Sequence, residues 1–228
     1  MAEDVVAALA RVRDRIEGAL DRRGGGEVAL VAVTKTFPAQ LVERAKSAGI
    51  EDIGESRADE LEEKAGLLGN DFVRWHFLGR LQRNKARRVA AVAHLIHSLD
   101  SLQLARKLSD QGDRLGAPVR CLLQVSPAEG DGKASFSAGE PLDLLAEVCE
   151  FPGLSVQGVM TMAPLTDDEA VLRRAFQAAR RVYEEAGRIP GFTPRHLSMG
   201  MSNDFEIAVE EGSNMVRLGT VLFGTRER

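Results

Sequence analysis

The sequence predicts a (β/α)8 barrel preceded by one additional N-terminal helix. Eight short apolar segments alternate with polar, helix-like segments along the chain. Several of the apolar segments contain almost no polar residue, which is typical of parallel strands that are covered on both faces. A doubly wound open sheet is the competing architecture, but the first strand-to-helix turn lacks the glycine-rich sequence typical of such sheets.

The elements follow in order along the chain. Apolar residues recur on one face of residues 5–20, which predicts the first helix, and Gly24 to Gly26 end it. The eight expected strands then cover residues 28–35, 51–56, 73–79, 95–100, 119–126, 154–162, 196–200 and 215–224. Each strand except the last is expected to be followed by a helix.

Local signals mark three of these helices. Pro141 lies near the start of one, and Thr166 with Glu169 forms a capping box ahead of another. Gly212 lies where the helix before the last strand should end. No linker composition divides the chain, so we expect a single domain over residues 1–228.

Composition excludes several classes of protein. The 228 residues are 44% hydrophobic and 28% charged, which indicates a globular chain. A net charge of −4 and an aromatic content of 5% argue against nucleic-acid binding. No apolar run approaches the ~20 residues that span a bilayer, and the acidic N-terminus is not a signal peptide. The two cysteines form no disulfide framework, so we expect a cytoplasmic protein.

Lys35 ends the first expected strand, and functional residues of barrels collect at strand ends. A lysine there should be partly desolvated, and desolvation favours the neutral, nucleophilic amine that forms a Schiff base with an aldehyde. The alternative is a structural role, in which the stem packs on the rim and the ammonium reaches water.

Two turns near the end of the chain suit an anion. Residues 198–202 lead directly into a helix, so their amides and hydroxyls can face a phosphate. Gly219 and Thr220 supply a second close backbone approach and another hydroxyl. The alternative is ordinary helix capping by Ser202. Together with Lys35, these turns predict a site for a phosphorylated aldehyde.

Arg217 interrupts the apolar last strand, where an unpaired guanidinium would be costly. It can pair with a buried carboxylate, for which Glu55 is a candidate. It can instead donate to the ring nitrogen of a heteroaromatic cofactor such as pyridoxal phosphate (PLP).

Six strings occur in order along the chain: AVTKT, IGES, WHFLGRLQRNK, GVMTMAP, LSMGMSNDFEIAVEEGS and MVRLGTVLFG. Together they resemble the pyridoxal phosphate homeostasis proteins (the YggS/PROSC family) from about Val28 to Phe223. The resemblance implies a PLP fold-type-III barrel like the N-terminal domain of alanine racemase, with PLP held covalently on Lys35 as the internal aldimine. It also implies Arg217 at the pyridine nitrogen, Met160 and His76 around the ring, and Ser198, Ser202, Gly219 and Thr220 at the phosphate. Ser56 and Met199 complete the expected cofactor-binding residues.

The chain departs from this family pattern at three places. Ser56 stands where the family usually has asparagine, and Arg80 stands where it has proline. The segment 133–136 reads KASF where the family commonly has KSG or KxGF. The ring contact of Ser56 and the role of Lys133 therefore stay open, as does that of Lys85 in the QRNK string.

The resemblance also bears on catalysis. Racemases of this fold use lysine and a tyrosine from a second, C-terminal β domain as their two bases. This chain stops at Arg228 directly after the last expected strand, so we expect that domain to be missing. The single tyrosine, Tyr183, has the spacing of a core-facing residue on an outer helix. Arg217 cannot leave a proton on the pyridine nitrogen, which makes the ring a poorer electron sink.

We therefore expect a monomeric carrier that buffers PLP or passes it to PLP-dependent apoenzymes, with no catalytic residues of its own. One alternative is a minimal PLP-dependent racemase or lyase. Another is a sugar-phosphate barrel enzyme that uses Lys35 as a Schiff-base aldolase.

No metal site is expected. His94 and His97 are three residues apart on an expected strand, which would place them on opposite faces. Cys121 and Cys149 stand alone and are expected to be core residues.

Overall fold

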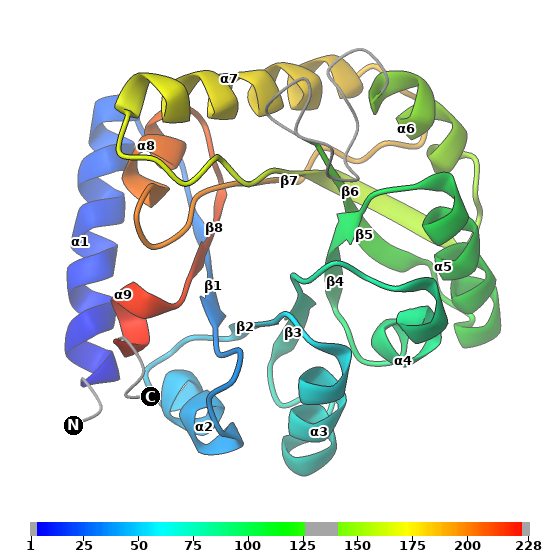
Figure 1. The fold of residues 1–228 in the computed structure, drawn as a ribbon, viewed down its shortest axis with the longest axis horizontal. Coiled ribbons are helices and arrows are strands. Elements are labelled where there is room, and N and C mark those ends of the chain that lie inside the picture. The colour runs from blue at the N-terminus through cyan, green and yellow to red at the C-terminus, as the bar shows by residue number, and fades with distance from the viewer. Residues whose placement is uncertain (1–3, 126–140, 225–228) are drawn as a thin grey trace.

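A computed structural model describes residues 4–125 and 141–224. Within this part of the chain, eight parallel strands form a closed barrel in which each strand pairs with the next and β8 pairs with β1 (Figure 1). The strands are β1 (Ala29–Val33), β2 (Asp52–Glu55), β3 (Arg74–Phe77), β4 (Leu95–Leu99), β5 (Val119–Gln124), β6 (Leu154–Met160), β7 (His196–Ser198) and β8 (Met215–Leu218). The predicted barrel is confirmed.

The helices surround the barrel (Figure 1). They are α1 (Val5–Arg23), α2 (Ala39–Ser47), α3 (Ala58–Leu68), α4 (Ala86–Ala90), α5 (Leu102–Leu115), α6 (Pro141–Cys149), α7 (Glu169–Ala186), α8 (Phe205–Glu210) and α9 (Thr220–Phe223), with a 3₁₀ turn, η1 (Arg83–Lys85), before α4. Within the described residues, no helix combines the length and the apolar character needed to cross a membrane.

Helix α1 precedes the barrel and packs beside α8 and α9 (Figure 1). The Asp4 carboxylate accepts a hydrogen bond from the amide of Val6 at 3.0 Å, and Gly24 ends the helix in the left-handed conformation. The predicted helix and its glycine stop are confirmed. Its buried face carries Val5, Ala8, Leu9, Val12, Ile16 and Ala19, and each large apolar side chain there contributes about 1.5–3 kcal/mol by leaving water.

The eighth strand is shorter than predicted. It ends at Leu218, and residues 220–223 form the short helix α9 instead of continuing the strand. The amides of Gly219 and Val221 donate to the Ser202 hydroxyl, both at 3.3 Å, instead of to a neighbouring strand. The prediction of one strand over 215–224 is therefore wrong in its second half.

The start of α7 also differs from the prediction. The Asp168 carboxylate caps this helix by accepting from the amides of Ala170 and Val171 at 2.9 and 3.2 Å. The Thr166 hydroxyl accepts from the amide of Asp168 at 3.1 Å, so Thr166 lies outside the helix. A capping box of Thr166 with Glu169 is wrong because the helix begins only at Glu169.

Two further helix boundaries agree with the sequence. Helix α6 begins at Pro141, and Gly212 follows the end of α8 with a φ of 108°, which glycine adopts without strain.

The inward-facing strand residues fill the barrel, and the outward-facing ones pack under the helices. A small inner cluster contains Val31, Leu95, Leu122, Met160 and Met215. Fully or almost fully buried polar residues, His76, His97, Ser198 and Arg217, also occur on the strands. Because buried polar groups need hydrogen-bond partners, the polar residues must be connected to one another or to the backbone.

Candidate functional site

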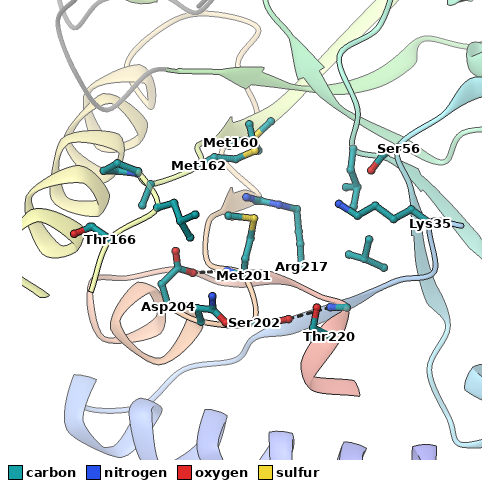
Figure 2. A pocket seen from close by; sticks show the side chains of 17 residues that line it. Lys35, Ser56, Met160, Met162, Thr166, Met201, Ser202, Asp204, Arg217 and Thr220 are labelled. Carbon is teal, nitrogen blue, oxygen red and sulfur yellow. Dashed lines mark hydrogen bonds between the residues drawn. The ribbon is translucent and has the colours of Figure 1, made fainter. Parts of the chain in front are cut away.

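A cavity of about 310 Å³ opens at the carboxyl ends of the strands (Figure 2). This volume lies at the lower end of the range of roughly 300–1,000 Å³ that is typical of small-molecule sites. The residues that line it are Val33, Lys35, Ser56, Leu78, Met160, Met162, Ala163, Pro164, Leu165, Thr166, Met201, Ser202, Asn203, Asp204, Arg217, Gly219 and Thr220.

Most of the predicted cofactor-binding residues share this cavity. Those that line it are Lys35, Ser56, Met160, Ser202, Arg217, Gly219 and Thr220. His76, Ser198 and Met199 do not line it. The turns after β1, β7 and β8, which are far apart in the sequence, therefore meet at one place.

Lys35 extends its side chain into the cavity (Figure 2). It is exposed, whereas the sequence predicted partial burial at a strand end. The expectation of burial is wrong because β1 ends at Val33, so Lys35 lies in the following turn, two residues beyond the strand.

The turn that carries Lys35 is tightly held. Thr36 has a φ of 66°, which is uncommon for a β-branched residue. Its amide donates to Oε2 of Glu60, on α3, at 2.6 Å. Backbone strain of this kind persists only where surrounding contacts impose it. The contact with α3 therefore fixes the direction in which the chain leaves Lys35.

A buried ion pair lies behind this turn. Lys64 of α3 donates to Oε1 of Glu55 at 2.6 Å and to the carbonyl oxygen of Thr34 at 2.8 Å. The Thr34 hydroxyl also donates to Oε1 of Glu55 at 2.6 Å. Burial raises the pKa of Glu55, and the hydrogen bond from Lys64 opposes this shift. The group joins the ends of β1 and β2 to α3.

Glu55 is therefore not the partner of Arg217, and that alternative from the sequence is wrong. Glu55 points toward α3, where it binds Lys64. Arg217 is 5% exposed; its Nη1 donates to Oγ of Ser198 at 2.6 Å and its Nη2 to the carbonyl oxygen of Thr161 at 2.8 Å. Burial lowers the pKa of Arg217 to about 10, while the charge of Asp204 opposes this shift. The guanidinium stays charged at neutral pH and has further N–H groups to offer.

Ser202, Asp204 and Thr220, on the turns after β7 and β8, form a polar corner of the cavity (Figure 2). The Ser202 hydroxyl accepts from the amides of Gly219 and Val221, both at 3.3 Å, which brings the turn after β7 onto the turn after β8. Thr220 adds an exposed hydroxyl. Asp204 closes the Ser202 turn by accepting from the amide of Met201 at 2.6 Å. Several hydroxyl and amide donors thus gather within one small region.

The wall of the cavity is largely apolar, and much of it was not predicted. Met160 is buried, whereas Met162, Leu165 and Met201 are exposed at the rim. The missed residues follow β6 and β7, where the rule about strand ends could have found them. Methionine and leucine carry no distinctive chemical signal, so nothing in the sequence separated them from core residues.

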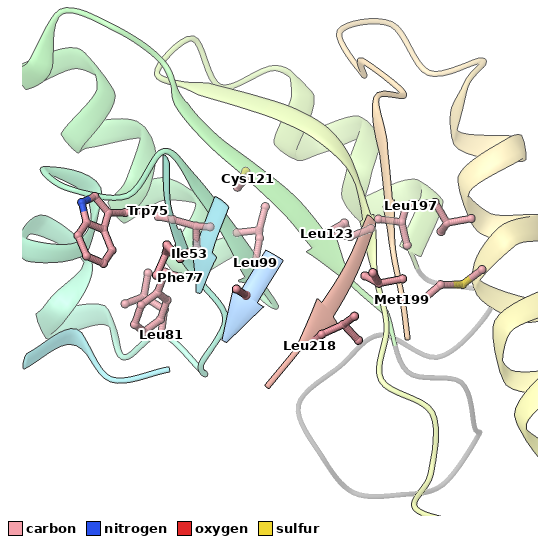
Figure 3. Close-up of a cluster of buried hydrophobic side chains, with 14 of the residues drawn as sticks. Ile53, Trp75, Phe77, Leu81, Leu99, Cys121, Leu123, Leu197, Met199 and Leu218 are labelled. Carbon is pink, nitrogen blue, oxygen red and sulfur yellow. The ribbon is translucent and has the colours of Figure 1, made fainter. Parts of the chain in front are cut away.

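Three predicted residues lie elsewhere. His76 is inside the barrel, with Nε2 3.0 Å from Oδ1 of Asp52. Ser198 lies beneath Arg217 and accepts its hydrogen bond. Met199 packs in the hydrophobic cluster between barrel and helices (Figure 3). Met199 differs from Ser198 because successive side chains along an extended segment point to opposite faces.

The histidines also differ from the prediction. His94 precedes β4, so strand alternation does not separate it from His97. The ring of His76 lies 5.9 Å from that of His94 and 5.2 Å from that of His97. Within the described residues, no group of three or more His, Cys, Asp or Glu side chains is placed to hold a metal ion.

Four further residues were singled out in the sequence: Lys85, Lys133, Cys121 and Cys149. The Lys85 ammonium contacts Asp59 at 3.0 Å, on the outer side of α3, and Lys133 lies outside the described residues. Cys121 is a buried free thiol, and Cys149 is a half-buried one. The expectation of core cysteines is thus met in full only by Cys121.

Tyr183 lies on α7, on the outside of the barrel. Its hydroxyl donates to the carbonyl oxygen of Pro194 at 2.7 Å, before the amino end of β7, and its ring packs edge-on against Phe192. The tyrosine is therefore remote from the cavity at the carboxyl ends of the strands, as the helical spacing predicted.

Comparison with known proteins agrees with the fold. A sequence model described as alanine racemase, N-terminal domain, matches residues 8–227. The pyridoxal phosphate homeostasis protein of Escherichia coli is 37% identical over 98% of this chain and 97% of its own length. That of Aquifex aeolicus is 34% identical over 96% of this chain and 97% of its own length. The chain belongs to the pyridoxal phosphate homeostasis protein family.

Solved structures of similar proteins share the architecture. PipY of Synechococcus elongatus with PLP bound has 32% sequence identity and a TM-score of 0.85, covering 96% of this chain and 100% of PipY. Alanine racemase of Clostridium difficile has a TM-score of 0.70 at 15% identity, and the match covers 94% of this chain and 57% of the racemase. The racemase thus shares the barrel fold.

Proposed function

We propose that this chain binds PLP in the cavity at the carboxyl ends of the strands and holds it covalently as a Schiff base on Lys35. In this proposal the chain serves vitamin B6 homeostasis by buffering PLP or delivering it to PLP-dependent apoenzymes. The observation that carries the proposal is the convergence of Lys35, Arg217 and the Ser202–Thr220 corner on one cavity.

The donor set fits the chemistry of PLP. Lys35 is the one lysine among the described lining residues, and its amine can condense with an aldehyde with loss of one water. Arg217 uses two of its five N–H groups for Ser198 and Thr161, which leaves donors for a ring nitrogen. When bound, PLP supplies a reactive aldehyde and an electron-withdrawing ring.

The phosphate and the ring also have suitable surroundings. The hydroxyls of Ser202 and Thr220 lie beside the amides of the turn after β8, and we assign them to the phosphate. Met160 and Leu78 provide an apolar wall, which we assign to the ring, with Ser56 at its edge. The PLP-bound structure of PipY, at 32% identity, supports PLP as the ligand in this family.

We further propose that the bound cofactor is held without catalytic turnover. Two-base racemisation needs an acid–base group on each side of the substrate carbon, one to remove the proton and one to return it. The single tyrosine of the chain is engaged with Pro194 on the outer helix layer and supplies no such group to the cavity. Arg217 is a cation, so it donates to a ring nitrogen and takes no proton from it.

Borohydride reduction of the PLP-loaded protein tests the covalent assignment. Reduction followed by peptide mass spectrometry should find the pyridoxyl group on Lys35, and Lys35→Ala should lose both the adduct and the visible absorption band. Lys85→Ala is the control, because Lys85 is bound to Asp59 outside the cavity. An unchanged band in Lys35→Ala would overturn the role of Lys35.

Two assays separate a carrier from an enzyme. The PLP-loaded chain should exchange no α-proton of a panel of amino acids with deuterated water, whereas a minimal racemase or lyase would do so catalytically. An apoenzyme should regain activity faster from the loaded chain than from an equal concentration of free PLP. Equal rates would argue for buffering without direct delivery.

The assembly and compartment are also part of this proposal. We expect a monomer, which light scattering of the loaded and unloaded chain can test. Both cysteines are free thiols, which suits the reducing cytoplasm in which we place this role.

A further inference from the structure

A continuous line of polar side chains runs through the barrel below Arg217. The Ser198 hydroxyl, which accepts from Arg217, lies 3.1 Å from Nδ1 of His97. Nε2 of His97 lies 2.9 Å from Nδ1 of His76. Nε2 of His76 lies 3.0 Å from Oδ1 of Asp52, the first residue of β2. The line thus joins the cavity to the amino ends of the strands.

The interior members of this line are withdrawn from water. Ser198 and His97 are 0% exposed and His76 is 1% exposed. At the far end, Asp52 is half-buried and binds the exposed Arg74 at 2.7 Å. Buried groups of this kind are costly when any one lacks a partner, so the hydrogen bonds depend on one another.

The donors and acceptors can be assigned along the line. Burial lowers the pKa of His97 well below its ordinary value, so its ring is neutral. Burial acts to raise the pKa of Asp52, but hydrogen bonds from Arg74 and His76 outweigh it and lower that pKa, so this carboxylate accepts. The Asp52 carboxylate can only accept, so Nε2 of His76 donates to it, and we assign each ring as a donor at Nε2 and an acceptor at Nδ1.

Each hydrogen on the line then has an acceptor. Asp52 accepts from His76, His76 accepts from His97, and His97 accepts from the Ser198 hydroxyl. The Ser198 oxygen is left with its lone pairs toward Arg217, which donates to it. The opposite polarity would make Ser198 accept from both sides and would leave its hydroxyl hydrogen without an acceptor on the line.

We propose that this line, from Asp52 through His76, His97 and Ser198, orients the Arg217 guanidinium toward the ring nitrogen of bound PLP. The inference rests on the proposed PLP site. His97 is then a positioning residue: it fixes the Ser198 hydroxyl, and the Ser198 oxygen fixes one edge of the guanidinium. The Thr161 carbonyl holds another N–H group of the guanidinium.

Two substitutions of His97 each keep one of its two hydrogen-bond contacts and remove the other. The His97→Asn amide can reach the position of Nδ1 and keep the contact with Ser198, whereas His97→Gln can reach the position of Nε2 and keep only the contact with His76. His97→Leu removes both contacts at similar size. Ser98→Ala is the matched control, because Ser98 lies on the same strand, is 1% exposed, and its hydroxyl has no hydrogen-bond partner within the described residues.

PLP titration of the variants measures the effect. His97→Leu and His97→Gln should raise the Kd for PLP about three- to tenfold, the scale of one lost hydrogen bond, and shift the absorption band of bound PLP. His97→Asn should restore most of the affinity and the band position, and Ser98→Ala should match the parent chain. A His97→Leu protein that is folded, binds as the parent does and shows the same band would overturn the proposal.

Nitrogen-15 NMR of the unloaded chain tests the line without any substitution. His97 should remain neutral as the Nε2–H tautomer from about pH 5 to pH 8. A titrating His97, or an Nδ1–H tautomer, would also overturn the proposal. If the parent chain binds no PLP, the proposed function fails, while the NMR result still decides whether the line exists.

Discussion

Replacing Lys64 with methionine tests how the turn that carries Lys35 is held in place. Lys64 is 5% exposed and Glu55 is 0% exposed, so methionine at position 64 would leave a carboxylate buried without its cation. Oε2 of Glu55 already has no hydrogen-bond partner among the described residues, so the carboxylate depends on the contacts of Oε1. The Thr34 hydroxyl would be its remaining donor.

The expected loss of stability follows from removing only one partner of a buried ion pair. Removing one partner of such a pair typically costs about 3–5 kcal/mol of unfolding free energy, because the other charge stays buried. Removing both charges is far cheaper. Glu55→Gln combined with Lys64→Met should therefore recover most of the loss, with a coupling energy of about 2 kcal/mol or more.

The loss in Lys64→Met should also depend on pH. Burial raises the folded-state pKa of Glu55, and removing the opposing Lys64 raises it further. A raised carboxyl pKa gives stability that is full below the unfolded value of about 4.3 and is lost as pH rises through the folded value. The deficit of the variant should therefore be smaller near pH 5 than near pH 8.

Urea unfolding of the unloaded chain at both pH values is the assay. Lys85→Met is the control, because this lysine makes an ion pair with Asp59 at the protein surface, and its loss should leave stability within experimental error. A Lys64→Met chain that loses less than about 1 kcal/mol, with no dependence on pH, would refute the reasoning that Lys64 holds Glu55 as a buried anion.

Three further outcomes are expected. Thr36→Gly should not lower the unfolding free energy. Relief of about 1–3 kcal/mol of backbone strain at a φ of 66° offsets the larger conformational entropy that glycine loses on folding. A urea midpoint well below that of the parent chain would contradict this. Gly79→Ala should lower the unfolding free energy by about 2–4 kcal/mol, because its Cβ would lie 1.9 Å from the carbonyl oxygen of Ser56. As the control, Gly66→Ala in α3 meets open space and should raise the unfolding free energy by up to about 1 kcal/mol. Equal melting temperatures of the two variants would contradict the clash. Asp52→Asn should lower thermal stability at neutral pH. The gap should begin to narrow below about pH 4, the unfolded-state value, and should go on narrowing as pH falls toward the lowered pKa of Asp52; a constant gap argues against this.

The alternation of apolar and polar segments was enough to predict the closed barrel. Its strands are covered by helices outside and packed side chains inside, so nearly every strand residue must be apolar. The same property explains the error over residues 215–224. Apolarity alone does not distinguish a buried strand from a buried helix, and the change occurs at Gly219 within a continuous apolar run.

The site was predictable to the extent that it lies at strand ends. That rule located Lys35, Ser202 and Thr220, which follow β1, β7 and β8. It could not show that Glu55 turns outward to Lys64, because that contact depends on where α3 packs. It could not separate the apolar lining residues from the core either, because Met162 and Met201 have the same chemistry in both places.

The remaining differences between the predicted and the observed site depend on how deep inside the barrel each residue lies, and the local sequence does not show that depth. Strand register places Ser198 level with Met215, one inward position below Arg217, and Arg217 level with Val31. Only a long side chain can reach the cavity from that level, so the guanidinium of Arg217 lines it. The short hydroxyl of Ser198 ends below and becomes a support. Sequence alternation predicts that both point inward, but the stagger between strands decides which one meets a ligand and which one holds its neighbour.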